Sequence, residues 1–298
     1  VLIFFIHHIA SSIQASSIIA TIAQQTTAAI DRFFPEKQAD GPDDTGADEN
    51  GQGLPALDER TWYPVPARVS GYIQFVDYAA LLNQARDRRT IVRMEHGIGA
   101  FVVQHATLVS LALTYPPDQA MINAFNEPYS VGRHRTVDQD PAYGIRQIVD
   151  MALKALSPGV NDTSTAIMSV DYLTSILARL TCQRFPPVYR YDEQTLRVIA
   201  KVPTFEGLLA EAFDQIRGSA GGNVGIMARL LNALETLASL TTSPRRRQAL
   251  YEQVQWMAEL ADRTLDATHD RARIEKRLTE VREALKIEPV LGAGDKKA

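Results

Sequence analysis

The chain has 298 residues, of which 45% are apolar and 22% are charged, and it carries 31 basic and 35 acidic side chains. Its single cysteine, Cys182, excludes an intrachain disulfide framework and a metal cage built from several cysteines. The length allows one large domain or two of ordinary size, and the average composition is that of a soluble globular protein.

The negative charge is concentrated in residues 36–60, which hold eight acidic and two basic side chains. The rest of the chain is therefore close to neutral. It lacks the positive field that nucleic-acid binding requires, so we expect no nucleic-acid partner. Because residues 36–60 are also rich in Gly and Pro and poor in apolar side chains, they predict an acidic flexible linker. At the other end of the chain, residues 289–298 predict a disordered tail.

Residues 1–35 have no charged side chain before Asp31 and begin with the apolar run Val1–Ile6. A complete membrane span needs about 20 predominantly apolar residues, and here His7 and His8 follow the short run at once. The segment therefore favours the end of a transmembrane helix that continues as an exit helix, with isoleucines near helical spacing. The alternative is an amphipathic helix that packs on its own domain.

Residues 61–118 predict a small β-rich unit. Four runs in it are typical of strands: 69–76, 90–94, 101–103 and 108–113. Asp77 follows the first run and is placed to cap a short helix. The order of strands and glycine turns resembles half of the barrel-sandwich of biotinyl and lipoyl domains. The attachment motif of those domains is missing, so no swinging-arm function follows and we expect no cofactor.

Residues 119–288 predict a mainly α-helical domain. Asp140 and Asp162 are placed to cap helices over 141–156 and 163–180. After these helices we expect a hairpin of 188–191 with 196–202, then helices over 205–217 and 223–240 and a long helix from Ser243. A last helix, capped by Asp270, carries an apolar stripe of Ile274, Leu278, Val281 and Leu285. The fold class predicted is α+β: an exit helix, a small β-rich barrel-sandwich-like unit and a mainly α-helical domain.

The densest group of polar side chains lies between Gly132 and Ala166, around two helix starts. Its members are Arg133, Arg135, Asp138, Asp140, Arg146, Asp150, Asn161 and Asp162. One interpretation is structural, with helix caps and ion pairs such as Arg146 with Asp150, four residues apart. The other is a ligand or ion site built from Asp138, Asp140, Asn161 and Asp162, with the arginines binding an anionic group.

This polar cluster leaves two functional alternatives open beside a structural role, a metal-assisted hydrolase and a sensor of a small anionic ligand. No arrangement of a nucleophile, a histidine and an acid can be placed in the sequence. The sequence therefore favours a non-enzymatic role, and we assign no catalytic, cofactor-binding or metal-binding residue from it.

Three strings of the sequence are distinctive: FFIHHIASSIQ, RTVDQDPAYGIRQIVDMALKALSPGVNDTSTA and FDQIR. They resemble the bacterial predicted-membrane-protein family known as domain of unknown function 2254, although Thr163 stands where a proline is common. The resemblance implies the soluble part of a protein of the bacterial inner membrane, joined to it through transmembrane helices that precede this part, and it implies no biochemical activity. The single cysteine favours the cytoplasmic side. The truncated span, the acidic linker and the absence of a catalytic signature favour a structural, regulatory or gating role, and we allow for a homo-oligomer.

Overall fold

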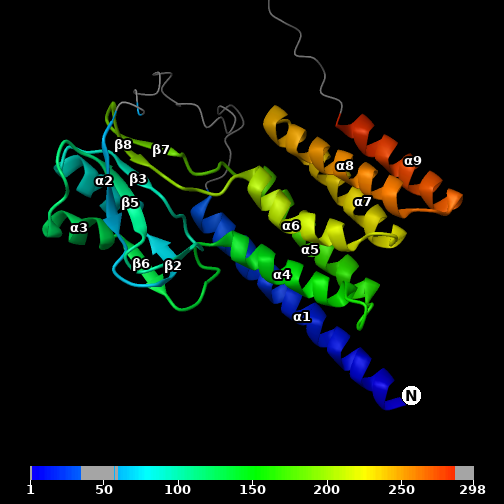
Figure 1. Cartoon of the computed structure of the whole chain (residues 1–298). Coiled ribbons are helices and arrows are strands. Elements are labelled where there is room, and N and C mark those ends of the chain that lie inside the picture. Colours follow the sequence, from blue (N-terminus) through cyan, green and yellow to red (C-terminus); the bar gives the residue numbers. More distant parts are fainter. Residues whose placement is uncertain (1, 35–56, 58–59, 286–298) are drawn as a thin grey trace, which may run out of the picture.

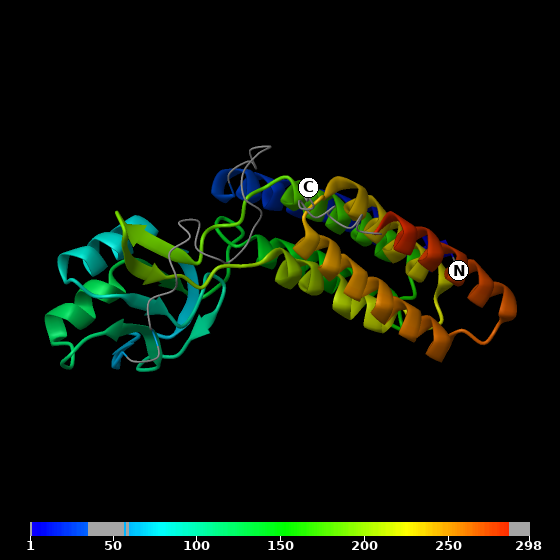
Figure 2. The ribbon, with the colours of Figure 1, turned by 90° about the horizontal axis from the view of Figure 1, so that it is seen from above.

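The computed structural model describes residues 2–34, 57 and 60–285, with side chains from Ala15 onward. It confirms the α+β class, because strands gather in one part of the molecule and most helices in the other. Figures 1 and 2 show these two parts joined end to end by a narrower junction. Except for Leu57 and Arg60, the predicted linker lies outside the described residues, as does the whole of the predicted tail.

The β part contains two sheets. The larger has the strand order β1 (Trp62–Pro66), β5 (Thr107–Ala112), β3 (Val92–Met94), β8 (Thr195–Ile199) and β7 (Tyr189–Asp192). The smaller has the order β4 (Phe101–Val102), β2 (Gly71–Val76) and β6 (Tyr129–Gly132). Helix α2 (Tyr78–Asp87) contacts β7 and β8, and helix α3 (Gln119–Asn126) contacts β1. Their buried apolar side chains form one core with those of the strands.

The β part extends beyond the predicted range of 61–118. Strand β6 pairs with β2, and the β7–β8 hairpin joins the larger sheet because β8 lies parallel to β3. The first four predicted strands agree with the structure to within two residues, and Asp77 caps α2 as predicted. The barrel-sandwich detail is not confirmed, because the strands form two separate sheets assembled from distant segments.

The helical part is a stack of three helical hairpins. They are α4 (Pro141–Leu156) with α5 (Thr163–Thr181), α6 (Phe205–Ser219) with α7 (Val224–Leu240), and α8 (Pro244–Thr264) with α9 (Thr268–Ala284). Helix α4 packs on α6, and α5 packs on α7, which in turn contacts α8 and α9. Helix α1 (Leu2–Phe33) lies along α4 and α5 on the other side of the first hairpin (Figure 1).

Local sequence signals explain most of the helix starts. The side chains of Asp140 and Asp162 accept backbone N–H bonds in the first turns of α4 and α5, as predicted. The predicted cap at Asp270 is wrong: α9 follows Ala267 without a side-chain cap, and Asp270 lies inside its first turn. There its carboxylate is favoured by the helix dipole rather than by capping. The apolar stripe of this last helix is buried in the core of the helical part.

Helix α1 packs on its own domain over its described side chains. Ile19, Ala23, Ile30 and Phe34 are buried in the same core as α4 and α5. This agrees with the second interpretation of the segment, an amphipathic helix that packs on its own domain. The side chains of Val1–Ile6, the predicted end of a transmembrane helix, lie outside those described. Among the described residues, no helix combines the length and the apolar character that crossing a membrane requires.

The closest approach of α1 to α4 depends on a glycine. A Cβ atom added at Gly144 of α4 would lie 1.9 Å from the Oγ1 atom of Thr26 on α1. Thr26 is fully buried and its hydroxyl donates to the carbonyl oxygen of Ile22. A helix normally loses about 1 kcal/mol of stability through a glycine in place of alanine, so the close helix contact must outweigh this cost.

We expect Gly144→Ala to lower the free energy of unfolding. Overpacking costs roughly 1–3 kcal/mol, and the higher helix propensity of alanine offsets about 1 kcal/mol of this cost. Urea unfolding measures the change. Gly159→Ala is the matched control, because nothing lies within 4 Å of a Cβ atom there. Adding Thr26→Ala to Gly144→Ala should restore part of the loss, and equal midpoints for Gly144→Ala and Gly159→Ala would contradict the prediction.

Candidate ligand site at the junction

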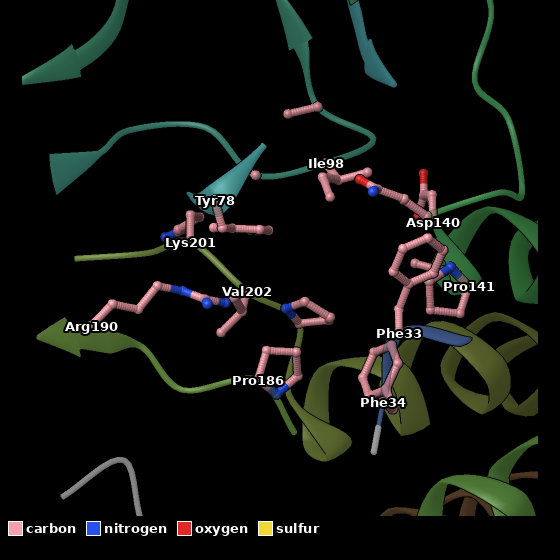
Figure 3. Close-up of a pocket in the computed structure, with 15 residues that line it drawn as sticks. Phe33, Phe34, Tyr78, Ile98, Asp140, Pro141, Pro186, Arg190, Lys201 and Val202 are labelled. Atoms are coloured by element: carbon pink, nitrogen blue, oxygen red, sulfur yellow. The ribbon is translucent and has the colours of Figure 1, made fainter. Parts of the chain in front are cut away.

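The chain crosses between the helical part and the β part four times: from α1 to β1, from β6 to α4, from α5 to β7 and from β8 to α6. We call these four connecting segments the passages. A cavity of about 360 Å³ lies where these passages meet. It is lined at the passages by Phe33, Phe34, Gln139, Asp140, Pro141, Ala142, Pro186, Lys201, Val202 and Pro203. The β part adds Tyr78, Gly97, Ile98, Ala100 and Arg190 (Figure 3). The volume is within the range of small-molecule sites, roughly 300–1,000 Å³.

The wall on the helical side is mainly apolar. Figure 3 shows Phe33, Phe34 and Pro141 together on this side of the cavity. Phe34 is buried and meets the ring of Phe185 edge to face, with ring centroids 5.3 Å apart. This contact joins the end of α1 to the chain that leaves α5, so the wall is built from two segments that are distant in sequence.

A buried arginine fixes the end of α5 beside this wall. Arg246 of α8 is 1% exposed and donates to the carbonyl oxygens of Thr181 and Gln183, at 2.7 and 2.9 Å. Its guanidinium also lies over the rings of Phe185 and Phe205. A cation at the carbonyl end of a helix is favoured by the helix dipole and satisfies carbonyl groups that have no partner in the helix.

The passage into α4 is fixed by a buried ion pair. Asp140 is 4% exposed, and its Oδ2 atom lies 2.8 Å from Nη2 and 2.9 Å from Nε of Arg135. Its Oδ1 atom accepts the backbone N–H of Tyr143 at 3.1 Å. Both carboxylate oxygens therefore have partners, which a buried charge requires.

The loop between β3 and β4 packs directly on this ion pair. A Cβ atom at Gly99 would lie 2.3 Å from Oδ2 of Asp140, and the backbone of Gly99 has a φ of +84°. Both facts require glycine at this position. In the preceding segment, Gln139 accepts the backbone N–H of Val76 from β2. At these two contacts, backbone of the β part therefore meets the side chains of Gln139 and Asp140 at the start of α4.

Burial raises the pKa of the Asp140 carboxyl above its ordinary value, although Arg135 and the backbone N–H groups at the start of α4 act in the opposite direction. The carboxyl thus keeps its proton to a higher pH in the folded chain than in the unfolded chain. This residue is part of the cavity lining, but its charge is already matched by Arg135.

The opposite wall carries two cations. Arg190 of β7 stacks on the ring of Tyr78, with its guanidinium carbon 4.2 Å from the ring centroid. Its Nε atom is buried and has no hydrogen-bond partner in the described part of the chain. Burial lowers the pKa of Arg190, and it raises the pKa of Tyr78 against the influence of that guanidinium. Lys201 follows β8 and lies on the same side of the cavity (Figure 3).

The structure brings together only some residues of the polar cluster that the sequence predicts as a candidate ligand site. Arg135 pairs with Asp140, and Arg146 pairs with Asp150 at 2.7 Å. Asn161 and Asp162 lie at the far end of α4, which spans 16 residues and is therefore about 24 Å long. Arg133 and Asp138 are exposed in the loop before α4.

The nominated ligand cluster is therefore not assembled, because α4 separates its acidic members. Asp162 accepts the N–H and the hydroxyl of Thr165 and serves as a helix cap. Within residues 2–34, 57 and 60–285, no group of three or more His, Cys, Asp or Glu side chains could hold a metal ion.

Sequence reasoning missed the residues that give the cavity its character, above all Arg190, Lys201 and Tyr78. They are distant in sequence from the cluster around Asp140. Arg190 and Lys201 belong to the β7–β8 hairpin and the residues after it, which join the larger sheet through the pairing of β8 with β3. Tyr78 begins α2, which packs on the same hairpin. One available signal was the proline at three of the passages, Pro141, Pro186 and Pro203. Proline restricts the backbone where the chain leaves one unit for another.

The family described as "Predicted membrane protein (DUF2254)" matches residues 1–236. This chain belongs to that family. The match confirms the resemblance carried by the three sequence strings, and it makes this a membrane-associated bacterial protein. The matched range also includes every residue that lines the junction cavity.

The chain is similar to "Uncharacterized protein Rv1290c" of Mycobacterium tuberculosis (strain ATCC 25618 / H37Rv) and "Uncharacterized protein Mb1321c" of Mycobacterium bovis (strain ATCC BAA-935 / AF2122/97). It is 30% identical to each over 279 residues, which cover 92% of this chain and 52% of the relative. The chain therefore spans about half the length of the curated relatives it matches. No solved structure matches it.

The raised pKa of Asp140 predicts a pH dependence of stability. We expect the difference in free energy of unfolding between the wild type and Asp140→Asn to fall as the pH rises above about 4, and then to level off. The stability that the proton contributes is fully present below the unfolded pKa and is lost as the pH rises through the folded pKa.

Chemical denaturation at a series of pH values measures this difference. Asp150→Asn is the matched control, because it removes another carboxylate of α4 that is exposed and paired with Arg146. A difference for Asp140→Asn that grows with pH would show that the pairing with Arg135 outweighs burial, contrary to the prediction.

Proposed function

We propose that this chain is the regulatory part of a bacterial membrane protein, and that it acts by changing the position of the β part relative to the helical part. The observation that carries the proposal is the convergence of all four passages of the chain on one cavity. A ligand or a partner segment that fills this cavity touches every connection between the parts at once. Its binding energy can therefore favour one relative position over another.

The way in which the parts meet supports this role. In the described residues, direct contacts between the strands and the helices of the helical part are few, whereas each part has its own apolar core. Small interfaces between two cores are the usual condition for relative motion. The junction instead depends on short connecting segments and on the packing of Gly99 over Asp140.

Helix α1 is the element that we propose transmits the change. Its last residues, Phe33 and Phe34, line the cavity, and its described side chains pack along α4 and α5. In Figure 1 it runs from the junction along the whole first hairpin and away from the β part. We propose that the membrane-spanning part of the protein precedes α1, so that a shift at the cavity reaches the membrane through one continuous helix.

Distance measurements between spin labels test the proposed motion. Labels at Gln104 of the β part and Gln255 of α8, in a Cys182→Ser background, report the separation of the two parts. We expect Ala142→Phe, which fills the cavity from α4, to shift this distance distribution. Labels at Lys154 of α4 and Gln255 of α8, both in the helical part, are the control and should give the same distances in both backgrounds. An unchanged Gln104–Gln255 distribution would argue against a movable junction.

We also propose that this part faces the cytoplasm, which the single free cysteine, Cys182, supports because thiols persist in a reducing compartment. Protease treatment of membrane vesicles that contain the whole protein tests the assignment. The chain should be cleaved in inverted vesicles and protected in right-side-out vesicles, with a known periplasmic protein domain as the control. The reverse pattern would place this part on the outer side.

A further inference from the structure

We propose that the junction cavity binds a small amphipathic anion, in which a carboxylate or phosphate head meets Arg190 and Lys201 and a short apolar body lies against Phe33, Phe34 and Val202. This inference rests on the proposed function for the choice of cavity and adds the chemical class of the ligand. It assigns the anion site to residues outside the polar cluster that the sequence singled out.

Arg190 is the first reason for an anionic ligand. Its guanidinium is partly buried on Tyr78, its Nε atom has no partner, and no described acidic side chain forms an ion pair with it. Removing a cation from water without a counter-charge is costly. A guanidinium offers two parallel N–H groups to a carboxylate or a phosphate, so an anion in the cavity would supply the missing partner.

The charge balance of the cavity points the same way. Lys201 adds a second cation on the wall that carries Arg190, also without an ion pair in the described part of the chain. The acidic side chain of the lining, Asp140, is neutralised by Arg135. The cavity therefore presents an excess of positive charge on one side, and a cationic ligand would meet no free carboxylate among the residues that line it.

The rest of the lining selects an apolar body. Apart from the cations, the lining includes Phe33, Phe34, Ile98, Val202 and three prolines. Figure 3 shows Phe33, Phe34 and Pro141 across the cavity from Arg190 and Lys201. A bare inorganic anion would leave this surface in contact with water, and a highly polar nucleotide would bury unpaired polar groups against it. The volume of about 360 Å³ suits a compact molecule rather than a long lipid chain.

Isothermal titration calorimetry on the intact chain, with four probes, tests this assignment. Octanoate and octyl phosphate carry both features, 1-octanol carries only the apolar body, and inorganic phosphate carries only the charge. We expect at least one of the two amphipathic anions to bind about tenfold more tightly than both 1-octanol and inorganic phosphate. The preference between octanoate and octyl phosphate then identifies the head group.

Variants connect the binding to the named residues. Arg190→Gln should weaken the better amphipathic anion roughly 10- to 100-fold, as expected for a buried charged hydrogen bond, and leave 1-octanol unchanged. Lys201→Gln, which alters a more exposed side chain, should weaken it about two- to fivefold. Arg86→Gln is the matched control, because it removes an exposed arginine of α2 outside the cavity. Circular dichroism and thermal unfolding verify that each variant is folded.

Three outcomes would overturn the assignment: no binding of either amphipathic anion, equal binding of 1-octanol, or equal binding of inorganic phosphate. Undiminished binding in the folded Arg190→Gln variant would also overturn it. These failures are distinct from failure of the proposed function, because the label distances are measured without ligand. A junction that moves but binds no amphipathic anion would keep the regulatory role and reject this ligand class.

Discussion

The arrangement of the molecule depends on the buried carboxylate of Asp140. A buried charge needs a partner for each of its oxygens, and here Arg135 and the first turn of α4 supply them. Because Gly99 packs on the same carboxylate, one residue ends the passage from β6, begins α4 and receives a loop of the β part. The position of the junction follows from satisfying this one group.

Helix dipoles explain the position of two buried charged groups at the junction end of the helical part. Helices α4 and α5 form an antiparallel hairpin, so the start of α4 and the end of α5 lie on the same side. The acid Asp140 occupies the positive end of α4, and the base Arg246 occupies the negative end of α5. Both groups are buried, and each stabilises a helix end at which the chain enters or leaves the helical part. The chain connections and the favourable electrostatics therefore coincide.

Local chemistry made much of the fold predictable, whereas the site needed the tertiary structure. The starts of α2, α4 and α5 were predictable from Asp77, Asp140 and Asp162, because a capping side chain binds a backbone N–H within three residues. The parallel pairing of β3 with β8 joins segments about 100 residues apart and has no local signature. The same limit applies to the polar cluster: its members are close in sequence but not in space, because α4 is a spacer of 16 residues between Asp140 and Asp162.

A buried charge and a partly buried charge at the junction differ in how they are paired. At the junction, Asp140 has every oxygen paired and a glycine fitted against it, so this chain can satisfy a buried charge closely. On the opposite wall of the cavity, Arg190 keeps a buried Nε atom without a partner in the described residues, as three other arginines do, but it also lies beside open space lined by aromatic and proline side chains. A purely structural junction would gain stability from a carboxylate beside Arg190 and from larger side chains in the cavity. Leaving both opportunities unused is consistent with stability given up for the binding of a ligand.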